Sequence, residues 1–202
     1  MGSPPYLVWL ARRDTVLALA VSIALTVAAA ALTGAIPTPQ MRGPSLLLTV
    51  STIHAMLLGS VIALAVRPAD PHLEALSPRP MRTLRLTLGV GLLLSQTLLL
   101  VTAGALAELA PPQVLAGLRT LAVTAGVCAL IARRASFPAA AMILLAYVGC
   151  VLFAGAEPDG DVAWWARLLA GWDAPVDLWL IGIGTAATCS AFLATPRTAP
   201  GT

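Results

Sequence analysis

The stretch TVLALAVSIALTVAAAALTGAI, from Thr15 to Ile36, carries no charged side chain. It is long enough to cross a bilayer as a helix, which takes about 20 apolar residues. Five further apolar stretches follow it, and together they predict six membrane-spanning helices at about 15–36, 45–66, 86–107, 113–132, 137–156 and 178–195. The sequence therefore indicates an all-α, polytopic integral membrane protein with a single transmembrane domain.

The composition supports the same class. Of the 202 residues, 58% are hydrophobic and only 10% are charged, against about 25% charged in ordinary soluble domains. The mean hydropathy of +0.89 excludes intrinsic disorder and a conventional water-soluble fold. The net charge of +3 comes from arginines scattered between apolar runs, so we expect no nucleic-acid partner.

Lysine is absent, and all twelve basic residues are arginine. The chain therefore lacks the lysine with which a P-loop binds nucleotide phosphates and the lysine that forms Schiff bases. We expect no cofactor in this chain, and any ATP and Mg²⁺ that drive its activity would be bound by a partner.

The arginines also predict the orientation, because cytoplasmic loops of membrane proteins are enriched in basic residues. A cytoplasmic N-terminus puts nine arginines inside and three outside, which favours a multi-pass protein of the cell membrane with both termini cytoplasmic. Cleavage of the first span as a signal peptide is the alternative, although its apolar run exceeds the usual 7–15 residues. The inner set is Arg12, Arg13, Arg67, Arg79, Arg82, Arg85, Arg133, Arg134 and Arg197; the outer set is Arg42, Arg119 and Arg167.

The inner loop between the second and third spans contains a short predicted helix. Asp70 is a good N-cap, Pro71 suits the first helical position, and Pro78 ends the helix after about two turns. Leu73 and Leu76 share one of its faces. This helix either docks on another protein or belongs to a loop whose arginines only maintain the topology.

The outer loop before the last span is rich in tryptophan. Trp164, Trp165 and Trp172 lie within it, and Asp161 and Gly171 are placed to begin and end a helix at about 162–170. The cluster is either an ordinary interfacial aromatic belt or a lid of interfacial or re-entrant helices at one end of the bundle.

Three polar residues are predicted within the spans: His54, Gln96 and Arg119. Ionisable groups at that depth are costly and often functional, but a neutral imidazole bonded to a neighbouring helix satisfies the same physics for His54. We expect Arg119 to pair with Glu108 or with an outer-loop aspartate, and Gln96 to bond across helices.

No catalytic constellation or metal-ligand cluster is present in the sequence. The last span carries Gly182, Ala186 and Ser190 at four-residue steps, a pattern that permits close helix contact.

Several motifs resemble those of ABC-2-type (type V) exporter permeases. PYLVWLARR at Pro5–Arg13 matches their N-terminal interfacial segment, DPHLEAL at Asp70–Leu76 their coupling helix, and the segment 161–172 their re-entrant helices. More narrowly, LEALSPRPMRTLR from Leu73 and LRTLAVTAG from Leu118 resemble small actinobacterial permeases.

This resemblance implies a permease subunit that is not itself an enzyme. It would export an amphiphilic or peptide-like substrate, in contact with membrane lipid, together with a second copy or another permease and a dimer of a cytoplasmic ABC ATPase. The residues implied are Asp70, His72, Leu73, Glu74 and Leu76 for coupling, His54, Gln96 and Arg119 for the translocation path, and Trp164, Trp165 and Trp172 for the outer gate.

Two alternatives come from other functional classes. One is a small integral membrane enzyme that acts on a lipid or prenyl substrate, with His54 and Arg119 near its pocket. The other is a non-transporting immunity or assembly factor, whose spans bind another membrane protein.

Overall fold

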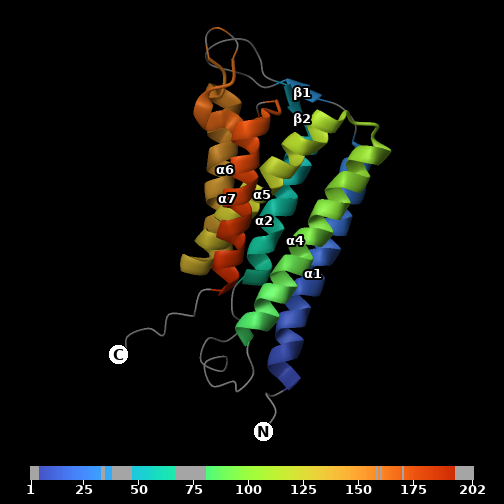
Figure 1. Ribbon diagram of the computed structural model, residues 1–202, viewed down its shortest axis with the longest axis vertical. Coiled ribbons are helices and arrows are strands. Elements are labelled where there is room, and N and C mark those ends of the chain that lie inside the picture. The colour runs from blue at the N-terminus through green and yellow to red at the C-terminus, as the bar shows by residue number, and fades with distance from the viewer. Residues whose placement is uncertain are drawn as a thin grey trace.

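The computed structural model describes residues 5–32, 35–37, 47–66, 81–157, 159, 161–169 and 171–193. Consecutive α-helices run up and down the long axis of the molecule (Figure 1). They are α1 (Pro5–Ala31), α2 (Val50–Val66), α4 (Met81–Leu106), α5 (Pro111–Arg134), α6 (Phe137–Ala154) and α7 (Ala174–Leu193); a short 3₁₀ helix, η1 (Trp164–Leu169), precedes α7.

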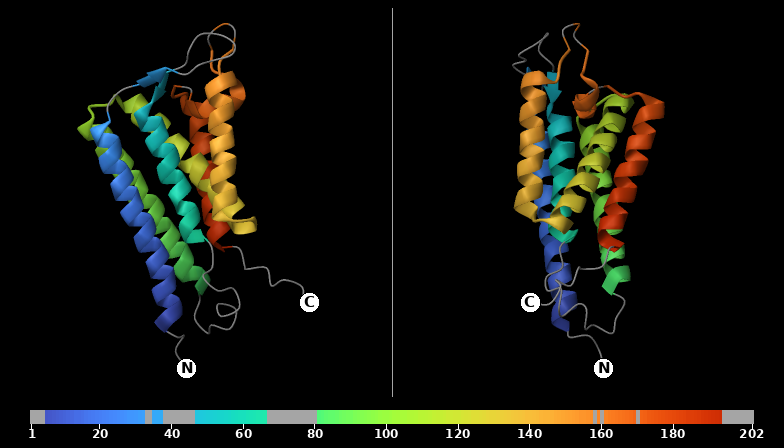
Figure 2. Two further views of the ribbon diagram at one scale, coloured as in Figure 1. Left: turned by 180° about the vertical axis from the view of Figure 1, so that it is seen from behind. Right: turned by 90° about the vertical axis from the view of Figure 1, so that its left-hand side faces the viewer.

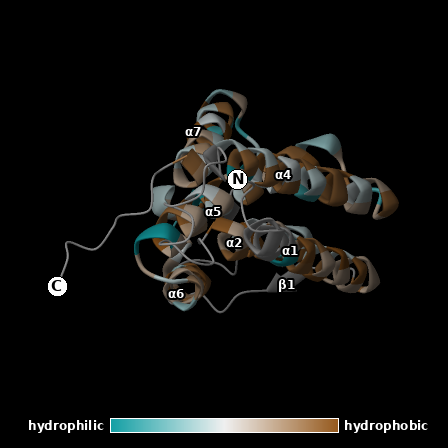
Figure 3. Cartoon of the chain, turned by 90° about the horizontal axis from the view of Figure 1, so that it is seen from below, coloured by the Kyte–Doolittle hydropathy of each residue, from teal (hydrophilic) through white to brown (hydrophobic). Residues whose placement is uncertain are grey.

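Five of these helices are long and apolar enough to cross a membrane. The sixth, α2, has 17 residues and spans about 26 Å at 1.5 Å per residue, just short of a hydrocarbon core of about 30 Å. Large apolar side chains are exposed around the bundle, as expected where lipid replaces water. Figure 3 shows hydrophobic residues, in brown, along the helices of the bundle. The predicted all-α, multi-pass membrane class is confirmed.

The first helix is longer at its start than predicted. α1 begins at Pro5 and continues through Arg12 and Arg13, so the segment Pro5–Arg13 is helical and continuous with the first span. Its position at the membrane interface stays a prediction. Proline fits the first turn of a helix, and no glycine or further proline interrupts the following residues.

A short antiparallel ribbon joins the first two helices and corrects the predicted span ends. β1 (Ala35–Pro37) pairs with β2 (Leu47–Thr49), with Ile36 opposite Leu48. The ends predicted at Ile36 and Ser45 therefore overextend the two helices. β2 leads directly into α2 at Val50, so the backbone groups at this end of the bundle pair in a ribbon instead of a helix.

α5 is the central helix. It packs most extensively against α2 and α7 and is the most deeply buried of the five long helices. The pair α1 and α4 lies to one side of this centre, with α6 and α7 to the other (Figures 2 and 3). The apolar core includes Ile62 of α2, Ala125 of α5 and Phe192 of α7.

Glycines allow these close approaches. A Cβ on Gly59 of α2 would overlap the Thr124 hydroxyl of α5. At the α5–α7 contact, a Cβ on Gly126 would lie 2.6 Å from the Gly184 carbonyl oxygen, and one on Gly184 would overlap the backbone at Ala122. α5 thus sits at backbone contact distance from both neighbours.

The two ends of the bundle differ in charge. Arg85, Arg133 and Arg134 lie toward the end where α4 and α6 begin and α5 and α7 finish, which we call the arginine end. The opposite end, which carries η1, is called the tryptophan end. It holds every carboxylate of the described residues except Asp14, namely Glu108, Glu157, Asp159, Asp161, Asp173 and Asp177.

A side chain at Gly184 should separate α5 from α7. We expect Gly184→Leu to destabilise the protein by about 1–3 kcal/mol, the usual cost of overpacking, as a lower melting temperature in detergent. Gly182→Leu is the matched control, because a Cβ there meets nothing within 4 Å. Equal melting temperatures for the two variants would contradict this packing.

Candidate functional site

The site is built on an ion pair between α5 and α7. Nη1 of Arg119 donates to Oδ2 of Asp177 at 2.9 Å, and the two side chains are 1% and 0% exposed. Arg119 lies about two turns into α5 and Asp177 in the first turn of α7. Both helices begin at the tryptophan end, so the pair is buried just beneath that end.

The same guanidinium binds the segment that precedes α7. We call residues 161–169 and 171–173 the tryptophan cap. Nη1 of Arg119 also donates to the carbonyl oxygen of Gly171 at 3.2 Å, and Nη2 donates to that of Leu168 at 3.1 Å. Arg119 thus holds both the carboxylate of α7 and the backbone of the cap.

Two further side chains donate to cap carbonyls. The Thr120 hydroxyl of α5 shares its proton between Leu168 O at 3.1 Å and Ala116 O of its own helix at 3.0 Å, and the Tyr147 hydroxyl of α6 donates to Trp165 O at 3.2 Å. On the cap itself, the Asp173 amide donates to Oδ2 of Asp177 at 2.8 Å. The cap is therefore attached to the bundle through these hydrogen bonds and through an apolar contact of its residues Ala163 and Ala166 with Val151 of α6.

A second arginine extends the network toward the surface. Nη2 of Arg167, on η1, donates to Oδ2 of Asp173 at 2.8 Å, with side chains 31% and 50% exposed. Its Nε lies 3.6 Å from Oδ1 of Asp177. The buried carboxylate thus faces two guanidinium groups, while the exposed Arg167–Asp173 pair contributes no more than about 1 kcal/mol.

Because Arg119 and Asp177 are both buried, breaking their ion pair has a large free-energy cost. Removing one partner of a buried ion pair leaves an uncompensated charge and costs roughly 3–5 kcal/mol, whereas the intact pair gives little net stability. The main contribution of the pair is to position the groups that Arg119 binds, because a planar guanidinium fixes the directions of its several donors.

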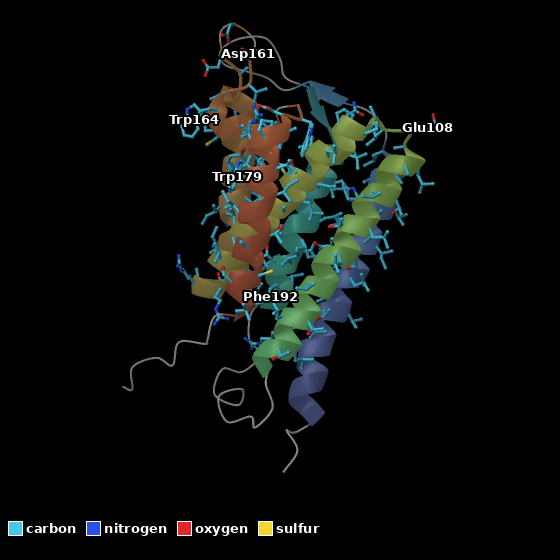
Figure 4. The ribbon with its side chains drawn as sticks, in the orientation of Figure 1. Glu108, Asp161, Trp164, Trp179 and Phe192 are labelled. Carbon is cyan, nitrogen blue, oxygen red and sulfur yellow. The ribbon has the colours of Figure 1, made fainter. Side chains whose placement is uncertain are left out.

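The structure selects one of the partners that the sequence offered. Pairing of Arg119 with an outer-loop aspartate is confirmed, and pairing with Glu108 is wrong. Glu108 is exposed in the turn between α4 and α5, on the other side of the bundle from Trp164 (Figure 4). Its φ of 52° suits that tight turn.

The helix predicted at 162–170 is only partly formed. The structure has 3₁₀ helix from Trp164 to Leu169, and Asp161 does not cap it. Instead, Asp161 accepts the Glu157 amide through its carbonyl, and Val162 pairs with Ala156 in an isolated β-bridge. The cap thus turns back on the end of α6 before η1 begins.

An apolar groove lies below the cap. α6 and α7 both pack on α5 but scarcely on each other, and the space between them encloses about 640 Å³. We call it the α6–α7 groove. Its lining includes Val127 and Cys128 of α5, Ala140 and Ile143 of α6, and Leu180 of α7, and it ends beneath Trp164, Trp165 and Arg167.

His54 and Gln96 contact one stripe of α1. Thr26 donates its hydroxyl to Ser22 O, so it accepts from Nε2 of His54 at 3.0 Å. Ser22 donates to Ala18 O and accepts from Nε2 of Gln96 at 3.2 Å. The predicted interhelical bond of Gln96 is confirmed, and His54 is bonded to a neighbouring helix, as the sequence also allowed.

His54 also lines a smaller cavity of about 340 Å³ among α1, α2, α4 and α5. Ser51 and Gln113 are the other polar side chains of its lining, which is otherwise apolar and small. The three residues predicted for a translocation path are therefore not brought together, since Arg119 of α5 binds the cap instead.

The predicted gate tryptophans differ in exposure. Trp164 is 84% exposed and points outward (Figure 4), whereas Trp165 and Trp172 are half-buried. The predicted coupling residues Asp70, His72, Leu73, Glu74 and Leu76 lie outside the described residues.

Sequence reasoning missed the roles of Thr120, Tyr147 and Arg167. Thr120 directly follows Arg119, and Arg167 lies six residues before Asp173, so local signals existed for both. Tyr147 has no such signal, because its partner Trp165 is reached only by folding the cap back on α6.

Comparison with protein-family models, curated proteins and solved structures finds no match to the chain.

Neutralising either partner of the buried pair should destabilise the protein, and neutralising both should restore much of the loss. Arg119→Met and Asp177→Asn are each expected to cost roughly 3–5 kcal/mol, with a double variant well below the sum of the two. Reversible unfolding in mixed micelles measures the cycle. Asp173→Asn, which changes an exposed carboxylate, should cost about 1 kcal/mol or less. Strict additivity of the two buried substitutions would contradict the pairing.

Proposed function

We propose that the chain is the permease subunit of an exporter that moves an amphiphilic or peptide-like substrate outward, using ATP hydrolysed by a separate ABC ATPase. The tryptophan end faces outward and the arginine end faces the cytoplasm. In this proposal, the six helices cross the membrane, and the tryptophan cap is the outer gate.

The attachment of the cap carries the proposal. It covers one end of an apolar groove, and side chains of α5 and α6 donate to its carbonyls. Hydrogen bonds between neutral groups contribute about 0.5–1.5 kcal/mol each, and those of a charged guanidinium about 1.5–3 kcal/mol, so they can exchange for water or a ligand during a transport cycle.

The energy source follows from the composition. A chain without lysine lacks the usual P-loop lysine, so ATP and Mg²⁺ would bind to a dimeric ATPase at the arginine end. Its docking element would be the short helix predicted at Asp70–Leu76, with Leu73 and Leu76 toward the ATPase.

A second copy, or another permease, would complete the pathway. Gly182, Ala186 and Ser190 are exposed on α7 and leave a flat strip on which another helix can pack closely.

The partner is tested by searching the genes beside that of this chain for an ABC ATPase and co-expressing the two proteins. Leu73→Asp with Leu76→Asp should lower the amount of ATPase that co-purifies by about tenfold or more, because charges replace apolar contacts. Ala69→Asp with Ser77→Asp adds the same charge to the same loop and should retain the ATPase. Equal retention by both variants, or no ATPase with the wild type, would contradict the proposed function.

The proposed orientation is tested with reporter fusions. Green fluorescent protein at the C-terminus should fluoresce, because it folds in the cytoplasm. Alkaline phosphatase inserted after Glu108 should be active, since that turn lies at the tryptophan end. The opposite pair of results would invert the topology and rule out the cap as an outer gate.

The cavity beside His54 favours a second candidate, a membrane enzyme with a lipid or prenyl substrate. Its lining holds an imidazole at one end of an apolar space. Activity that needs no ATPase and disappears in His54→Gln, which keeps a donor for Thr26, would support the enzyme. Dependence on the ATPase, with His54→Gln still active, would favour the exporter.

A further inference from the structure

We infer that the α6–α7 groove binds one acyl chain of an anionic bilayer lipid, whose phosphate lies against Arg167 at the tryptophan end. This inference does not depend on whether the chain transports anything.

The length of the groove suits part of one acyl chain. On α6 its lining runs from Ala140 to Tyr147. These positions are about 10 Å apart at 1.5 Å per residue, which is less than half of a hydrocarbon core of about 30 Å. The volume of about 640 Å³ lies within the range of small-molecule sites.

The groove is also polarised along its length. Its deep part is lined by Val127, Cys128 and Ala140, with no charged group. The polar groups gather at the other end, where Trp164, Trp165 and Arg167 meet. An occupant therefore has a long apolar part and a polar group at one end.

The positive charge in the groove lining favours a lipid with an anionic headgroup. Arg167 is the one charged residue of the groove lining, and its side chain is 31% exposed. Its Nη2 donates to Oδ2 of Asp173, and its Nε lies 3.6 Å from Oδ1 of Asp177. Arginine binds phosphate through several donors, so a lipid phosphate fits beside it.

The resident carboxylate of Asp173 is a competitor of modest strength. It is 50% exposed, and such surface pairs contribute between about 0 and 1 kcal/mol. Asp177 also faces Arg167, with its Oδ1 3.6 Å from Nε, so a phosphate would displace only Asp173 and share Arg167 with Asp177, while the buried Arg119–Asp177 pair keeps the cap in place.

The binding site is tested in nanodiscs that contain either phosphatidylglycerol or phosphatidylcholine. Each lipid carries a photoreactive diazirine on its acyl chain, and labelled peptides are mapped by mass spectrometry. For the wild type, we expect labelling of α5 and α6 at the groove and a preference for phosphatidylglycerol.

Two neighbouring positions on α6 test the chain site. Ile143→Trp fills the groove from a residue that is 51% exposed, and should lower groove labelling by both lipids about tenfold, equivalent to about 1.4 kcal/mol. Met142→Trp, at a residue that is 66% exposed and outside the lining, should leave labelling unchanged. Val127→Trp blocks the groove from α5 and decides the question if Ile143→Trp does not fold.

The headgroup is tested separately. Arg167→Gln should lower the preference for phosphatidylglycerol by roughly tenfold, the equivalent of one charge-assisted hydrogen bond. Asp173→Asn, which removes the competitor and keeps a good N-cap for α7, should raise that preference.

Equal labelling by Ile143→Trp and Met142→Trp would overturn the inference. So would a wild-type protein without preference between the two lipids. Protection of the groove by a second copy of the chain, seen as intermolecular crosslinks from position 143, would assign it to a protein interface instead.

Discussion

The buried pair between Arg119 and Asp177 is the interaction on which the tryptophan end depends. Two charges removed from water are tolerated only where each has several partners, and here the partners are backbone groups of the cap as well as the opposite charge. The pair therefore does two things at once: it joins α5 to α7, and it sets the position of the segment between α6 and α7.

Close packing of the helices is what brings those charges together. α5 and α7 approach to backbone contact at Gly126 and Gly184, in the part of the bundle toward the arginine end from the ion pair. α6 has no comparable contact with α7, so a space stays open between them. The ion pair and cap at one end, with glycine contacts below, thus create a groove that is closed above and open along its side.

Much of the fold could be predicted from hydropathy, because each apolar run corresponds to one helix. The ends of the first two helices could not be predicted in this way, because hydropathy does not distinguish apolar residues of a β-ribbon, such as Ile36 and Leu48, from apolar residues of a helix. The partner of Arg119 could be narrowed to Glu108 or an outer-loop aspartate but not to Asp177, because Asp173 lies only one turn away from it. Choosing between Asp173 and Asp177 requires knowing how α5 and α7 are shifted relative to each other along the axis of the bundle. The partner of His54 could not be predicted either. The hydroxyl of Thr26 on α1 already donates to Ser22 O within its own helix, so the sequence does not indicate that it also accepts a bond from His54.

The central claim is that Arg119 holds the cap, and hydrogen–deuterium exchange of the intact protein in nanodiscs tests it most directly. Arg119→Lys keeps the charge opposite Asp177 but replaces the planar set of donors that reaches Leu168 and Gly171. The account predicts faster exchange of amides in the cap, with no change in α4. Unchanged exchange in the cap, or an equal increase throughout the bundle, would contradict it.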